Sequence, residues 1–153
     1  MTRASSRIPN LFGVHYFFFS GGEMPFIDRS MSEVSTEATG TEATVLFVDS
    51  EPAILTVYEL LCGSEYSVIT ARDGREALEM FGPHVDFAVL ERELPEASGD
   101  DVVRVLRSEG YRTPVAFVST VDPDPEPTVE YDEYLTKPID NGRLRSVIDA
   151  YTR

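Results

Sequence analysis

The chain has 153 residues, of which 42% are hydrophobic and 10% aromatic, so it can bury a core and is not disordered throughout. Its 13 basic and 27 acidic residues give a net charge of −14, which argues against direct binding to nucleic acid or to an anionic membrane. The single cysteine, Cys62, excludes an internal disulfide and a zinc site built from paired cysteines.

Residues 1–43 are predicted to be a leader that is either disordered or the product of a wrongly assigned start codon. Residues 1–30 carry a net charge of +1, so the whole acidic excess lies after them, and Met31 or Met24 is the alternative start. The one apolar run, 11–19, is far shorter than the roughly 20 residues of a membrane-spanning helix. Glycine and histidine interrupt this run, which also disfavours an export signal.

Residues 44–153 are predicted to form one domain, in which short apolar runs alternate with runs of helical periodicity. An unbroken apolar run such as 45–48 is typical of a strand that is buried on both faces. Strands that alternate with helices predict a parallel sheet with right-handed crossovers. Five strands are expected, at 45–48, 66–70, 87–90, 114–118 and 134–136.

The helices are predicted from apolar residues that recur every three or four positions. The first begins at Pro52 and ends at Gly63. The last follows Pro138, and its apolar face is formed by Leu144, Val147, Ile148 and Tyr151. Between the fourth and fifth strands, three prolines at alternate positions in 123–127 oppose a helix. We therefore expect an α/β fold: a doubly wound, flavodoxin-like, five-stranded parallel sheet with the fourth helix shortened or absent.

Polar side chains follow the carboxyl ends of these strands, where ligands bind in such sheets. Carboxylates, a hydroxyl and an ammonium group should therefore meet at one edge, a set that suits a hard cation or a transferred phosphoryl group. Lys137 is the only lysine in the chain, which makes a specific role for it the favoured interpretation. The residues are Asp49, Ser50 and Glu51 after the first strand, Glu91 after the third, Ser119 and Thr120 after the fourth, and Lys137 after the fifth.

These motifs resemble the response-regulator receiver (CheY-like) domains of two-component signalling. The tracts 121–124 and 132–135 further resemble the haloarchaeal HalX-type regulators. That subtype agrees with the acidic, lysine-poor composition, which by itself is typical of halophilic proteins that work in molar salt. The matching stretches are 45–52, 86–95, 114–120 and 134–138, within a span of about 44–151.

The resemblance implies a role for each of these residues and also reveals two departures. Glu91 stands at the phosphoacceptor position, where the family has aspartate, and Ser50 replaces an acidic metal ligand. Ser119 and Lys137 take the hydroxyl and ammonium positions, and the resemblance further implies a cis bond between Lys137 and Pro138. Tyr134, together with Thr120, is the implied switch, and Asp49 and Glu91 are the remaining metal ligands.

We expect a degenerate, stand-alone receiver that is not an enzyme and works as an interaction module in a cytoplasmic phosphorelay. Its expected partner is a histidine kinase or another signalling protein, or a second copy in a homodimer, and its expected cofactor is none or weakly bound Mg²⁺. Glu91 either imitates a phosphorylated aspartate through Lys137 or marks a dead site. The alternative is a residual Mg²⁺-dependent phosphoacceptor served by a histidine kinase. A flavodoxin-type ligand binder is disfavoured, because no glycine-rich loop follows the first strand.

Overall fold

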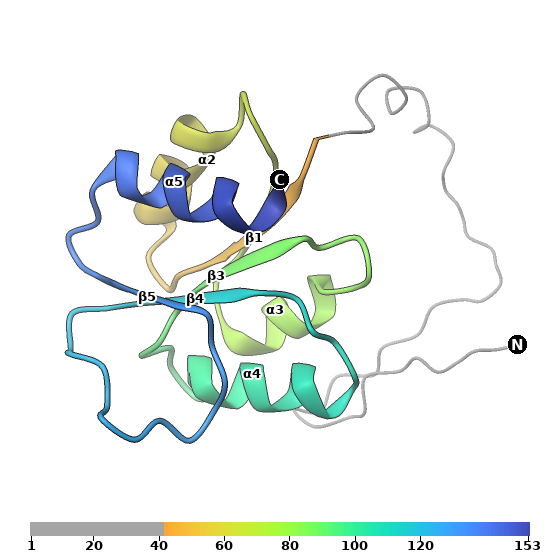
Figure 1. The fold of residues 1–153 in the computed structure, drawn as a ribbon, viewed down its shortest axis with the longest axis vertical. Coiled ribbons are helices and arrows are strands. Elements are labelled where there is room, and N and C mark those ends of the chain that lie inside the picture. Colours follow the sequence, from red (N-terminus) through yellow and green to blue (C-terminus); the bar gives the residue numbers. More distant parts are fainter. Residues whose placement is uncertain (1–41) are drawn as a thin grey trace, which may run out of the picture. The chain divides into compact units, whose positions relative to one another are not determined.

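The computed structural model describes residues 42–153, so the leader predicted over residues 1–43 lies outside this range but for its last two residues. The described part of the chain forms one sheet and the helices that cover it (Figure 1). The strands are β1 (Thr44–Val48), β2 (Ser67–Ala71), β3 (Phe87–Glu91), β4 (Val115–Ser119) and β5 (Glu133–Thr136). The helices are α2 (Pro52–Cys62), α3 (Gly74–Met80), α4 (Gly99–Ser108) and α5 (Asn141–Thr152).

The sheet has the strand order β2-β1-β3-β4-β5, and every neighbouring pair is parallel. Helices α2 and α5 cover one face, and α3 and α4 lie on the other (Figure 1). The predicted doubly wound α/β fold is confirmed. Because all strands run the same way, their carboxyl ends lie at one edge, where the polar residues of the sequence follow them.

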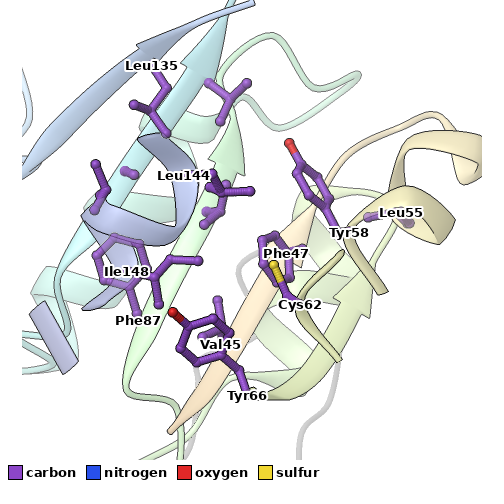
Figure 2. Close-up of a cluster of buried hydrophobic side chains, with 14 residues drawn as sticks. Val45, Phe47, Leu55, Tyr58, Cys62, Tyr66, Phe87, Leu135, Leu144 and Ile148 are labelled. Carbon is purple, nitrogen blue, oxygen red and sulfur yellow. The ribbon is translucent and has the colours of Figure 1, made fainter. Parts of the chain in front are cut away.

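The core against α2 and α5 is built from alternate strand residues, as expected where a strand sends every second side chain to one face. Phe47 stacks on Tyr58 of α2 with 4.4 Å between the ring centroids (Figure 2). From α5, Leu144 and Ile148 enter the same cluster and are almost completely buried. This packing fixes β1, and with it the position of the polar residues that follow β1.

The connection between β4 and β5 contains no helix within the described part of the chain. Residues 120–132 form turns and irregular backbone, as the alternating prolines predict. The helix labelled α4, which follows β3, is by contrast fully formed and begins with a capping box between Ser98 and Asp101. Among the described helices, none combines the length and the apolar character that crossing a bilayer would require.

Two leucines on different helices test this description of the core. Leu144 is 1% exposed and Leu60 is 79% exposed. We expect Leu144→Ala to lower the free energy of unfolding by about 2–5 kcal/mol, because it removes buried methyl groups and leaves a cavity. The same change at Leu60 should stay within about 0.5 kcal/mol, as is usual for surface substitutions. Urea unfolding at high salt measures both, and equal losses would contradict the placement of α5.

Candidate functional site

Four strands deliver side chains to the carboxyl edge of the sheet. Asp49 comes directly after β1, and Glu91 is the last residue of the adjacent strand β3. Ser119 is the last residue of β4, and Lys137 comes directly after β5. Three of these residues meet in one cluster, whereas Ser119 makes its side-chain contacts elsewhere.

The Lys137 ammonium group joins two carboxylates from different strands. Its Nζ lies 3.4 Å from Oδ2 of Asp49 and 3.2 Å from Oε2 of Glu91. The expected cis peptide bond between Lys137 and Pro138 is present. Asp49 is 1% exposed, and its other oxygen accepts a hydrogen bond of 2.9 Å from the Glu51 amide. The cluster is therefore a buried carboxylate and a half-buried one that share a single cation.

Ser50 holds the remaining oxygen of Glu91. The Ser50 amide and hydroxyl both donate to Oε1, at 3.0 and 3.1 Å, while Lys137 donates to Oε2. Both carboxylate oxygens of Glu91 are thus engaged by groups of the same chain. Ser50, which the family resemblance places at a metal-ligand position, thus acts as a hydrogen-bond donor to Glu91.

The two carboxyl groups respond differently to this environment. Burial is the largest influence on Asp49 and raises its pKa above the ordinary value, against the lowering effects of the Glu51 amide and Lys137. Burial acts in the same direction on Glu91, but the Ser50 amide, the Lys137 ammonium and the Ser50 hydroxyl together lower the pKa of Glu91. Burial lowers and the two carboxylates raise the pKa of Lys137, and the carboxylates prevail. Glu91 and Lys137 therefore form an ion pair at neutral pH.

Ser119 contacts a residue that the sequence did not single out. Its hydroxyl lies 2.8 Å from both carboxylate oxygens of Glu93 and accepts a hydrogen bond of 2.9 Å from the Val121 amide. Within the described residues, its side chain makes no hydrogen bond to Glu91 or Lys137. Glu93 lies two residues after Glu91 in the loop that leaves the same edge, and that spacing was the one available signal.

Tyr134 is held by a second residue that the sequence did not single out. Its hydroxyl donates to the Val121 carbonyl at 2.6 Å, and Arg92 lies over its ring with 5.7 Å from Cζ to the centroid. Arg92 also pairs with Asp100 and Asp124, each at 2.8 Å. Thr120, the other expected switch residue, has an exposed side chain with no hydrogen bond in the described part of the chain.

These residues fit a divalent cation poorly. Magnesium requires near-octahedral oxygen ligands, and the cluster offers two carboxylates whose contacts are already taken up by Lys137, Ser50 and the Glu51 amide. Across residues 42–153, no group of three or more histidine, cysteine or acidic side chains is arranged to hold a metal ion. The positive charge beside both carboxylates comes from the Lys137 ammonium group.

Replacing Lys137 tests its role in the cluster. We expect Lys137→Met to lower the free energy of unfolding by about 1–3 kcal/mol at low salt, because two carboxylates lose their shared donor. The loss should shrink at molar salt, which screens charges within about 3 Å. Arg143→Met, which removes an exposed ion pair with Glu133, is the control and should cost less than about 1 kcal/mol. Thermal unfolding across salt measures this, and a Met variant as stable as the parent at every salt concentration would exclude the pairing.

The pKa of Glu91 provides an independent check. Because this pKa is lowered from 4.5, Glu91 contributes stability above that pH, and the contribution is lost as the pH falls through the folded-state pKa. Lys137→Met should raise the pKa of Glu91, since burial then acts against fewer compensating groups. Carbon-13 NMR of the carboxyl group measures the shift. Asp149, whose pKa is lowered by Tyr66 in another part of the fold, should keep its titration in both proteins.

Known proteins are similar to this chain in sequence and in fold. The family model for the response regulator receiver domain matches residues 45–149. A candidate transcriptional regulator of Haloferax volcanii is 33% identical over 124 residues, which cover 80% of this chain and 21% of that protein. The transcriptional regulatory protein TrcR of Mycobacterium tuberculosis is 34% identical over 125 residues, covering 76% of this chain and 45% of TrcR.

A solved structure gives the same result. The chemotaxis protein CheY4 of Vibrio cholerae aligns with a TM-score of 0.64 and 27% identity, over 72% of this chain and 98% of that one. The chain spans less than half the length of the two curated relatives named above. The family match nevertheless covers more than two thirds of the chain and reaches all five strands of its sheet. The chain belongs to the response regulator receiver domain family.

Proposed function

We propose that this receiver is degenerate and works in a phosphorelay as a protein-interaction module that is not itself phosphorylated in the ordinary way. The observation that carries this proposal is the contact of 3.2 Å between Glu91 and Lys137. The resemblance implies a phosphoacceptor aspartate where Glu91 stands. In this chain the Glu91 carboxylate, which needs no modification to carry its charge, already contacts Lys137, the ammonium group that would bind a phosphoryl group.

The surroundings of Glu91 support this interpretation over the residual phosphoacceptor. A carboxylate that attacks a phosphodonor needs an oxygen free to approach phosphorus in line, and phosphoryl transfer depends on such positioning. Both oxygens of Glu91 already accept hydrogen bonds from Ser50 and Lys137. The poor fit to a divalent cation points the same way. Of the two interpretations left open for Glu91, these contacts favour imitation of a phosphorylated aspartate over a dead site.

The interaction partners are proposed from charge and family. A histidine kinase or another signalling protein is the proposed partner, with self-association in a homodimer as the other arrangement to test. The curated relatives are named as transcriptional regulators, but a net charge of −14 argues against direct DNA contact by this chain. The HalX-type subtype, a halophilic source and a cytoplasmic location belong to the same proposal, supported by composition and by the Haloferax relative.

Incubation with acetyl phosphate and Mg²⁺, followed by intact mass measurement, tests the proposal. The parent chain should gain no phosphoryl group. The double variant Ser50→Asp with Glu91→Asp restores the acidic pattern that the resemblance implies, and it should gain one. A phosphoryl adduct on Glu91 of the parent chain would overturn the proposal in favour of the residual phosphoacceptor.

A second measurement tests the permanent pairing without relying on that double variant. Glu91→Gln keeps the size of the side chain but removes the charge that attracts Lys137. We expect the Nζ resonance of Lys137 and the amide resonances of β5 to shift in this variant. Unchanged spectra would mean that Glu91 does not influence the edge of the sheet. The matched control is Glu59→Gln on the exposed side of α2, which should leave these resonances in place.

A further inference from the structure

Ser119 carries a buried hydroxyl group whose two hydrogen bonds connect different segments. The residue is 0% exposed, and its hydroxyl donates to Glu93 at 2.8 Å while it accepts from the Val121 amide at 2.9 Å. A buried hydroxyl that lost its acceptor would remain unsatisfied, which is unfavourable. Glu93 therefore determines where the Ser119 oxygen lies and, through it, where the Val121 amide is held.

The hydrogen bonds continue from Val121 to the aromatic residue of β5. The Val121 carbonyl accepts from the Tyr134 hydroxyl at 2.6 Å, and Arg92 donates to the same hydroxyl at 3.4 Å. Arg92 is the chain neighbour of Glu93, so the contacts form a closed ring through the loop after β3, the end of β4 and β5. Loss of Glu93 would leave the Ser119 hydroxyl, which accepts from the Val121 amide, without its own acceptor. The start of the connection over 120–132 would then be held less firmly.

We propose that Glu93 is a positioning residue that holds Ser119, Val121 and Tyr134 in one arrangement without a phosphoryl group. The Lys137 ammonium group then contacts the carboxylate of Glu91, and the Ser119 hydroxyl contacts the carboxylate of Glu93. The inference rests on the proposed function only in assuming that no phosphoryl group occupies the edge. Val121 is 54% exposed and Tyr134 is half-buried, so both can contact a partner. Glu93 thus determines the conformation of the surface that these two residues form.

Hydrogen exchange at the Val121 amide, followed by NMR on the full chain at high salt, tests this role. Glu93→Ala should speed exchange at Val121 about ten- to a hundredfold, because the Ser119 hydroxyl that accepts from this amide loses its charged hydrogen-bond partner. Glu93→Gln should have a smaller effect, because an amide oxygen still accepts from Ser119 but without the charge. The control Glu96→Ala removes an acidic residue from the same loop and should leave Val121 unchanged.

Two further comparisons separate positioning from general destabilisation. Amides in the central strand, such as that of Val89, should keep their protection in Glu93→Ala, whereas a globally weakened fold would expose them too. Ser119→Ala should speed exchange at Val121 as well, and the double variant should be no faster than Ser119→Ala alone. Unchanged exchange at Val121 in Glu93→Ala, or additive effects in the double variant, would overturn the inference. Neither result depends on whether Glu91 accepts a phosphoryl group, which the acetyl phosphate experiment decides.

Discussion

The arrangement of the edge depends on the contacts of the Lys137 ammonium group with Asp49 and Glu91. Asp49 is almost fully buried at the end of β1, and Glu91 lies beside it at the end of the neighbouring strand. Two carboxylates this close repel each other and lose hydration, which raises the free energy of the charged state. One ammonium group within 3.4 Å of both offsets that repulsion. Because Lys137 comes from β5, it also connects the last strand to the centre of the sheet.

The edge places two glutamates beside the two groups, Lys137 and Ser119, to which the family resemblance assigns the ammonium and hydroxyl positions. Glu91 contacts Lys137, and Glu93 contacts Ser119, so the cation and the hydroxyl each have an anion of the same chain. A covalent phosphoryl group can be added and removed, whereas the charge of a carboxylate at neutral pH is permanent. Under the proposed function, this receiver would convey information through its abundance or through partner binding rather than through its phosphorylation state.

The connection between β4 and β5 shows how side chains can replace a missing helix. Its prolines oppose helical hydrogen bonding, so its backbone must be held by other means. Arg92 provides one anchor through Asp124 and contacts the rings of Phe117 and Tyr134. The bonds that join Ser119 and Tyr134 to Val121 provide the second anchor. The surface next to the site is thus fixed by polar contacts that start in the loop after β3.

The sequence by itself determined the strands, the helices and the edge at which the polar residues collect, because hydrophobic periodicity and parallel connections leave few other arrangements. Composition alone singled out Lys137. Only the tertiary structure decided that Ser119 pairs with Glu93 and that Arg92 lies against Tyr134. These partners are 26 and 42 residues apart, and their side chains meet because the loop after β3 directs them there. Strand periodicity ends where such a loop begins, so the sequence pattern carries no information about those directions.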